Sequence, residues 1–164
     1  MIVKYSNGIT IKKLNDQMLS ATAAANVPTI DFGHLLKEDN QYYTLIMYDP
    51  DAPTANHNFV HWIIINIQSN TKFDTLLTYT GPNPPPGSGV HRYIFNLYNQ
   101  PNGIAKDINI DERSIPISGL LKKLNLTKAK VISSVFFTCS STKGGTRKRR
   151  FRNKRRKTRK TRKI

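Results

Sequence analysis

Two aspartates mark the part of this sequence whose residue types and spacing could do chemistry. Asp49 and Asp51 follow directly after the apolar run 42–48, with Pro50 between them and Pro53 close behind. Both prolines lack the amide proton that an inner strand needs, so a strand must end here, with the aspartates at its rim. Residues two apart in an extended chain point to the same side. Two carboxylates so close require cations, hydrogen-bond donors or a shared proton, and the segment therefore predicts a polar pocket.

Two later segments supply histidines that can donate hydrogen bonds to these carboxylates or balance their charge. His61 lies near the start of the run 59–67, which is apolar enough for a strand buried on both faces. A Pro-rich loop and a Gly-Ser-Gly turn precede His91, and the strand that follows places His91 and Tyr93 on one face. Charged histidines can donate to an anion, and glycine-flanked amides can approach an oxyanion closely. Crowded carboxylates and histidines titrate together, so the pocket can bind a phosphate monoester and a nearby amine.

The same residues allow other interpretations. Aspartate and histidine ligate zinc, but their spacing matches no metal motif, so we expect no metal and no other cofactor. A hydrolase needs a nucleophile beside a base, and Ser88 is the hydroxyl of the segment 81–89. Its place in a Gly-rich turn favours a role through backbone amides, so no catalytic residue is predicted. A purely structural role also stays open, because aspartate before proline caps turns and buried histidines often satisfy carbonyls.

Some neighbouring residues have predicted structural roles. Arg92 alternates away from His91 along the strand, so it is expected to pair with an acidic loop residue outside the pocket. Ala52-Pro53 and the run 84–86 are candidates for a cis peptide bond. Cys139 is expected to be a small buried side chain on a strand.

The remaining pattern predicts a β-rich domain. Asn7-Gly8 favours a tight hairpin turn within residues 2–11, and residues 14–27 are expected to be extended or looping. Ser114 is a candidate N-cap for a helix that ends near Asn125. Residues 68–78 are predicted to be a connection. Further strands are expected at 28–32, 41–48, 59–67, 91–98 and 130–138.

Charge divides the chain into two regions. The net charge is +16, and residues 143–164 hold 14 of the 26 Lys and Arg side chains. The other 12 nearly balance the 10 acidic side chains, all of which lie outside this region. This predicts a domain over residues 1–140 and a tail over 141–164 that is disordered when free. The residues predicted to bind polyanions are Arg147, Lys148, Arg149, Arg150, Lys154, Arg155, Arg156 and Lys157.

The tail has three open interpretations. It could be a nuclear localisation signal, a segment that binds nucleic-acid phosphates, or a segment that attaches the protein to an anionic membrane surface. The single cysteine excludes an intrachain disulfide, and the N-terminus has no signal-peptide core. We therefore expect an intracellular protein, cytoplasmic or nuclear, and not a secreted one. Frequent Asn, Ile and Lys hint at a viral or microbial source, in which case a place in the virion is expected.

Three blocks of the sequence resemble one known family. Residues 49–53, the strand around His61 and the segment 81–93 closely resemble the phosphatidylethanolamine-binding protein family in order and spacing. The resemblance covers residues 2–139. It implies a mainly β fold with peripheral helices, in which a central antiparallel sheet is accompanied by a smaller second sheet. The ligand site that it implies consists of Asp49, Asp51, Pro53, His61, Gly81, Pro84, His91 and Tyr93.

The resemblance also implies a function. It suggests a non-enzymatic module that binds a phospholipid headgroup or another phosphate anion and regulates by docking. The expected partners are phosphoethanolamine or another phosphate-bearing ligand, a signalling protein, and a polyanion such as nucleic acid or an anionic membrane held by the tail. The alternative is a nucleic-acid-binding or virion-associated protein that uses the tail and keeps the pocket only as a vestige.

Overall fold

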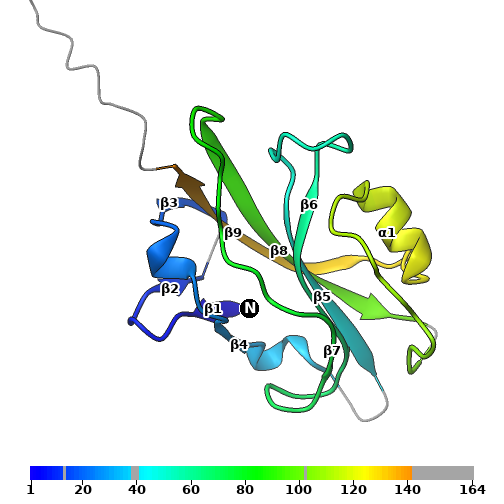
Figure 1. The fold of residues 1–164 in the computed structure, drawn as a ribbon. Coiled ribbons are helices and arrows are strands. Elements are labelled where there is room, and N and C mark those ends of the chain that lie inside the picture. Colours follow the sequence, from blue (N-terminus) through cyan, green and yellow to red (C-terminus); the bar gives the residue numbers. More distant parts are fainter. Residues whose placement is uncertain (13, 38–40, 102, 142–164) are drawn as a thin grey trace, which may run out of the picture.

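Two β-sheets of unequal size form the framework of the protein (Figure 1). This computed structural model describes residues 1–12, 14–37, 41–101 and 103–141. A three-stranded sheet has the order β2-β1-β4, and a six-stranded sheet has the order β3-β9-β8-β5-β6-β7. Neighbouring strands are antiparallel except for β3 and β9. The elements are β1 (Ile2–Lys4), β2 (Thr10–Ile11), β3 (Leu14–Met18), η1 (Thr22–Ala24), β4 (Thr29–Asp31), η2 (Gly33–Leu35), β5 (Tyr42–Asp49), β6 (Phe59–Ile67), β7 (Asp74–Leu77), β8 (Val90–Gln100), α1 (Ile117–Lys123) and β9 (Val131–Ser140). The predicted fold class is confirmed.

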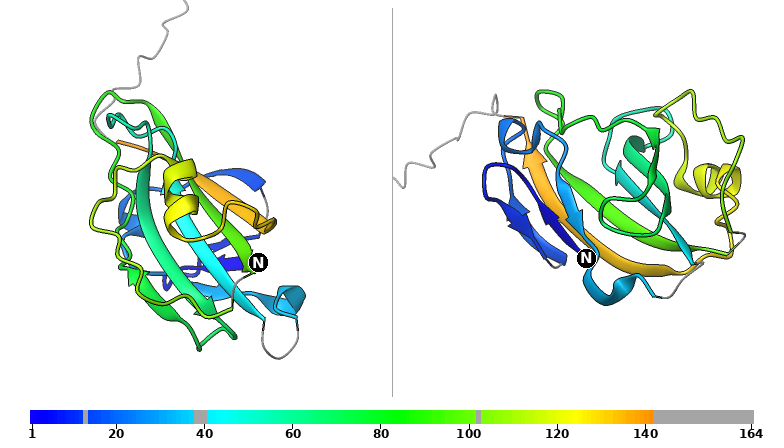
Figure 2. Two further views of the ribbon diagram at one scale, coloured as in Figure 1. Left: turned by 90° about the vertical axis from the view of Figure 1, so that its right-hand side faces the viewer. Right: turned by 90° about the horizontal axis from the view of Figure 1, so that it is seen from below.

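The large sheet lies between two other layers. Figure 2 shows the small sheet on one side of it and α1 on the other. One core fills the space between the sheets and includes Tyr93 and Phe137, whose rings stack 5.2 Å apart. A second core, which includes Ile63 and Leu120, lies beneath α1. Because both faces of the large sheet are covered, the sequences of its central strands are almost entirely apolar.

A β-bulge interrupts the pairing of β5 with β6. Tyr48 pairs with Val60 and Met47 with Trp62, which leaves His61 as an extra residue. Val60 belongs to the core beneath α1, whereas Trp62 belongs to the core between the sheets. His61 lies on the Trp62 side, because its ring meets the ring of Tyr93 at 5.1 Å. A bulge of this kind redirects a side chain, and here it turns two consecutive residues to the same face.

Some local predictions were wrong. Residues 74–77 form the edge strand β7 within the predicted connection. The prediction missed this short strand because its sequence, Asp-Thr-Leu-Leu, does not alternate polar and apolar side chains. Pro116, and not Ser114, holds the N-cap position of α1, and the Ser114 carbonyl instead accepts from the Asn56 amide. No peptide bond among the described residues is cis, so the candidate cis bonds at Ala52-Pro53 and in the run 84–86 are trans. Asn125 ends the helix as predicted, with a φ of 54° that breaks the helical path.

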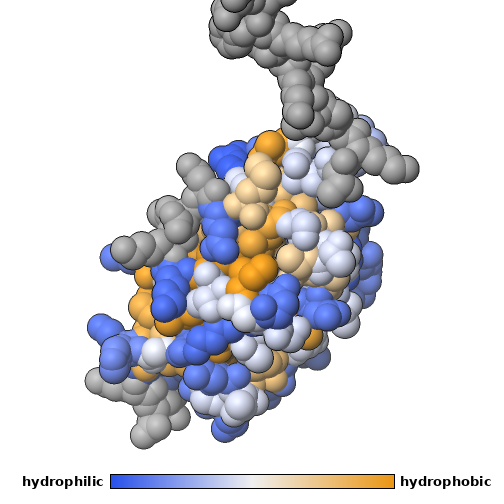
Figure 3. All heavy atoms as spheres, turned by 90° about the vertical axis from the view of Figure 1, so that its left-hand side faces the viewer, coloured by the Kyte–Doolittle hydropathy of each residue, from blue (hydrophilic) through white to orange (hydrophobic). Residues whose placement is uncertain are grey.

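The face that carries the small sheet and β3 has an apolar centre. Figure 3 shows hydrophobic side chains gathered in the middle of this face, with hydrophilic ones around them. Met18, at the end of the outermost strand β3, is 59% exposed. No helix within the described ranges has the length and hydropathy that crossing a membrane requires. The predicted tail comprises residues 141–164, and all of it except residue 141 lies outside the described residues.

Candidate functional site

A pocket of about 340 Å³ opens where three strands of the large sheet meet. β5 ends at Asp49, which pairs with Phe59 at the start of β6. β8 begins at Val90 and runs antiparallel to β5, so its first residues lie at the same edge. The antiparallel register therefore brings segments that are far apart in the sequence to one place. Six of the eight predicted ligand-site residues line the pocket: Asp49, Pro53, His61, Gly81, His91 and Tyr93.

The centre of the pocket is a chain of hydrogen bonds through His91. Its Nδ1 lies 2.7 Å from Asp49 Oδ2, and its Nε2 lies 2.8 Å from Ser88 Oγ. The Ser88 hydroxyl donates to the Pro85 carbonyl at 2.7 Å, so it must accept a hydrogen bond from Nε2–H. A carboxylate oxygen accepts, so the ring donates to Asp49 from Nδ1–H. Both ring nitrogens are then donors, which is the hydrogen-bond pattern of a cationic ring.

This chain has the residue order of a serine-hydrolase triad but a different proton arrangement. A triad histidine needs a bare nitrogen that takes the proton of the serine hydroxyl. In this pocket Ser88 gives its proton to Pro85, and His91 already holds one on Nε2. The Ser88 amide also donates to the Pro85 carbonyl, at 3.1 Å, so it is not free for an anion as the sequence suggested. The arrangement offers a cationic donor and lacks an activated nucleophile.

His61 differs from His91 in charge. Its Nδ1 lies 2.7 Å from the Thr80 carbonyl, which can only accept, so the proton is on Nδ1. Burial lowers the pKa of His61 below its ordinary value of 6.5, although the Thr80 hydrogen bond and the Asp49 charge oppose this. The ring is therefore neutral at neutral pH, and Nε2 is an acceptor. The expectation that both histidines act as charged donors is wrong for His61.

Tyr93 provides a second donor beside His91. The side chain is almost completely buried, and its ring lies between those of His61 and Phe137. Burial raises the pKa of the Tyr93 phenol, and the negative charge of Asp49 adds to this effect. The hydroxyl therefore keeps its proton at physiological pH and remains a neutral hydrogen-bond donor.

Asp51 is one of two predicted residues that do not line the pocket. Its carboxylate binds Arg92 through two hydrogen bonds of 2.8 Å, to Nε and Nη2, and accepts the Arg92 amide at 2.9 Å. The predicted ion pair of Arg92 is thereby confirmed. Residues 50 and 51 form a turn, in which the Asp51 amide donates to Asp49 Oδ1 at 2.8 Å. The extended spacing assumed for the two aspartates does not apply inside this turn, so their side chains diverge.

Pro84 is the other predicted residue outside the pocket lining, and it is buried in the wall. Gly81 lies where that wall meets η1. A Cβ at Gly81 would come within 3.0 Å of the Ala24 carbonyl oxygen and the Ala25 Cα. The residues that the sequence interpretation missed are Ala52, Thr54, Phe59, Thr80, Asn83 and Pro85, and each is within two positions of a predicted residue. Within the described ranges, no three His, Cys, Asp or Glu side chains are grouped closely enough to hold a metal ion.

The lowered pKa of His61 predicts a pH dependence of stability. Between the folded-state pKa and about 6.5, the unfolded chain binds a proton that the folded chain does not, so stability falls as the pH is lowered. Urea denaturation of the wild type and of His61→Gln should therefore diverge between about pH 7.5 and about pH 5, with the smaller loss in the variant. The exposed His34, changed to Gln, serves as the control and should behave as the wild type. Equal pH dependence in the wild type and His61→Gln would contradict the buried neutral ring.

Comparison with known proteins identifies relatives of the chain. The family model described as phosphatidylethanolamine-binding protein matches residues 5–137. The carboxypeptidase Y inhibitor of Saccharomyces cerevisiae is 30% identical over 154 residues, with 75% of this chain and 67% of the inhibitor covered. The 26 kDa secreted antigen of Toxocara canis is 35% identical over 108 residues, with 62% of this chain but only 39% of the antigen covered. The chain thus spans well under half of the antigen's length.

Solved structures agree with this relationship. The carboxypeptidase Y inhibitor, in a complex with its cognate proteinase, superposes with a TM-score of 0.66 at 25% identity, covering 85% of this chain and 81% of the inhibitor. A phosphatidylethanolamine-binding protein from Plasmodium vivax gives a TM-score of 0.63 at 18% identity, covering 84% and 83%. The second likeness concerns the fold alone.

The predicted intracellular, non-secreted location is wrong. The relative from Toxocara canis is a secreted antigen, so proteins related to this chain are not confined to the cell interior. The inference relied on the lack of a signal-peptide core and on the single cysteine, which reports the redox compartment only for folds that need disulfides. This fold has two apolar cores, and a domain with cores of its own can be stable without a disulfide in either compartment.

The sequence blocks, the fold and the relatives lead to one assignment. The match over residues 5–137 covers the segments that line the pocket and every strand except β1 and the last three residues of β9. The chain belongs to the phosphatidylethanolamine-binding protein family.

Proposed function

We propose that the chain is a non-enzymatic binding module whose pocket holds a phosphate-bearing headgroup such as phosphoethanolamine. The observation that carries the proposal is the cationic His91, held between Asp49 and Ser88 in a buried pocket. A phosphate oxygen is a stronger acceptor than the Ser88 hydroxyl, so it would take over the hydrogen bond from His91 Nε2–H. The neutral hydroxyl of Tyr93 is a second donor on the same side.

The pocket also suits the amine of the headgroup. His61 Nε2 is an acceptor in the neutral ring, and an ammonium group is a pure donor. The Phe59 ring lies 4.8 Å from the His61 ring, and the Arg113 guanidinium already lies over it, 6.0 Å from its centroid, so only its other face is open to a further cation. Asp49 contributes negative charge nearby, although its oxygens already accept from His91 and the Asp51 amide. A zwitterion with the phosphate at His91 and the ammonium at His61 would match this distribution.

We further propose that regulation occurs by docking and that the tail binds a polyanion. The related carboxypeptidase Y inhibitor is seen with its cognate proteinase, which supports a protein partner as the target of docking. Cys139 pairs with His91, and Ser140 pairs with Val90, so the chain leaves the domain beside the pocket. A domain over residues 1–140 followed by the basic segment would thus hold the pocket against an anionic membrane, where phosphate headgroups are abundant.

The headgroup proposal is tested by titrating the protein with O-phosphoethanolamine in a calorimeter. We expect saturable one-to-one binding, weakened about tenfold to a hundredfold in His91→Ala, because a hydrogen bond to a charged group contributes about 1.5–3 kcal/mol. His34→Ala, which removes an exposed histidine, is the matched control and should bind as the wild type. Unchanged affinity in His91→Ala would refute the proposed site. If that variant retained every activity and only the tail mattered, the vestigial-pocket alternative would be correct.

The absence of catalysis is tested at Ser88. With its proton given to Pro85, this hydroxyl should react with a fluorophosphonate probe no faster than the exposed Ser69 hydroxyl. Mass spectrometry of the treated protein reads out both sites. Hydrolysis of p-nitrophenyl acetate should be equal in the wild type and Ser88→Ala. Preferential labelling of Ser88, or ester turnover lost in Ser88→Ala, would show that the residues work as a triad.

The tail proposal is tested with vesicles. The full chain should bind vesicles that contain phosphatidylserine, and binding should weaken steeply as salt rises, since each basic residue near the surface contributes about 1 kcal/mol. A chain that lacks residues 143–164 should lose this binding but keep its affinity for phosphoethanolamine. Sedimentation with vesicles measures the first property and calorimetry the second. Equal vesicle binding with and without these residues would contradict the tether.

A further inference from the structure

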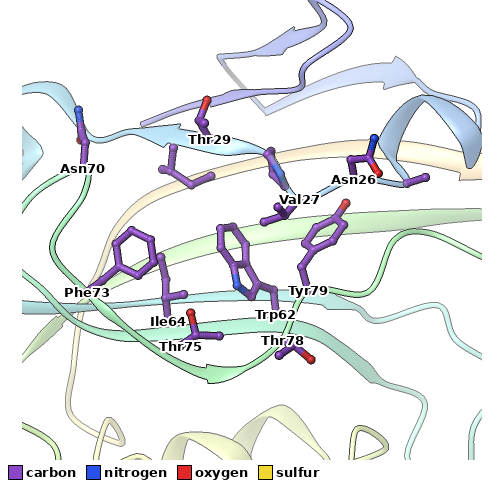
Figure 4. A pocket seen from close by; sticks show the side chains of 13 residues that line it. Asn26, Val27, Thr29, Trp62, Ile64, Asn70, Phe73, Thr75, Thr78 and Tyr79 are labelled. Carbon is purple, nitrogen blue, oxygen red and sulfur yellow. The ribbon is translucent and has the colours of Figure 1, made fainter.

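A second cavity, of about 560 Å³, lies between the edges of the two sheets. Figure 4 shows Phe73, Trp62 and Tyr79 along one side and Val27 and Thr29, from β4 and the segment before it, along the other. The segment 78–81 separates this cavity from the phosphate pocket. Its first two residues line the cavity, and its last two line the pocket. The cavity is therefore a separate site, and its use does not depend on the proposed function.

The cavity is lined without charge. None of the side chains that line it is acidic or basic, in contrast to the phosphate pocket with Asp49 and His91. An ion here would meet no opposite charge, only the neutral amides and hydroxyls of Asn26, Asn70 and three threonines, so the lining disfavours charged ligands. Three aromatic rings dominate one side, and the Trp62 and Tyr79 rings meet edge to face at 5.7 Å. Aromatic rings in a cavity lining favour planar ligands, which can stack on the ring faces or contact the ring edges.

The polar groups of the cavity further narrow the choice of ligand. The Tyr79 hydroxyl donates to the Ala24 carbonyl at 2.6 Å, so its donor is already used. Trp62 is only 4% exposed, yet its indole N–H makes no hydrogen bond to any described residue. All fully buried polar side-chain atoms in the described part of the chain have partners, so this nitrogen must reach accessible space. The accessible space beside Trp62 is the cavity, and a bound molecule with an acceptor would satisfy the donor.

We infer that this cavity binds a neutral, planar, mostly apolar small molecule that carries one hydrogen-bond acceptor for Trp62. The volume falls within the roughly 300–1,000 Å³ that small-molecule sites occupy. The rings supply the contact area, and the indole N–H sets the orientation. An acyl chain would fill part of the space but would leave the indole donor unpaired, which is why a ring ketone or a similar compound fits better.

The test uses a matched pair of probes, 2-acetylnaphthalene and 2-ethylnaphthalene, which have similar shapes but differ in the carbonyl acceptor. Trp62 is the single tryptophan of the chain, so its indole N–H gives one identifiable signal in a nitrogen–proton NMR spectrum. Both probes should bind saturably, and the ketone should move the indole proton downfield. The ketone should also bind about twofold to tenfold tighter, as expected for one neutral hydrogen bond. In Trp62→Phe this difference in affinity should vanish.

Matched variants locate the binding. Val27 is 57% exposed at the cavity, so Val27→Phe should block it without disturbing the fold and should weaken both probes. Val131→Phe, at a valine that is 48% exposed on β9, should bind both probes as the wild type does. Saturating phosphoethanolamine should displace neither probe, because the cavity is separate from the phosphate pocket. Equal affinity of Val27→Phe and Val131→Phe, tight binding of the anion 2-naphthoate, or an unmoved indole signal would overturn the inference.

Discussion

The buried ion pair of Asp49 with His91 is the constraint on which the rest of the site depends. The two residues are 3% and 1% exposed, and their charged atoms lie 2.7 Å apart. A charge removed from water so completely is tolerated only with a partner and further hydrogen bonds, which the Asp51 amide and Ser88 provide. The turn after β5 and the turn before β8 are thereby tied together. Removing either partner would leave a buried charge unmatched, so the pair constrains both loops of the pocket.

The bulge at His61 links this pocket to the second cavity. In a regular strand His61 and Trp62 would point to opposite faces, but the extra residue turns both toward the core between the sheets. His61 then lines the charged pocket, and Trp62 lines the uncharged cavity on the other side of the segment 78–81. One local irregularity therefore places a polar site and an apolar site next to each other on the same face of the large sheet.

The sequence predicted the features that depend on local pattern. Apolar runs located β5 and β6, with a proline stop after β5, and Asn7-Gly8 located the first hairpin. The family resemblance of three blocks placed His61 and His91 in one pocket. The sequence could not predict features that depend on how distant segments pack. Asp51 left the pocket because a turn changed its direction toward Arg92. The cavity beside Trp62 exists only because β4, from the start of the chain, lies across β6 and β7, and no local pattern encodes that approach.

Phosphate binding as proposed requires a cationic His91, hydrogen-bonded to Asp49 and Ser88, beside a neutral His61. The most direct measurement is nitrogen NMR of the histidine rings in the ligand-free protein at neutral pH. The account predicts that both ring nitrogens of His91 carry protons and that His61 carries one, on Nδ1. A neutral His91 with a bare Nε2 facing Ser88 would contradict it, because the pocket would then hold a base beside a hydroxyl instead of a cationic donor for phosphate.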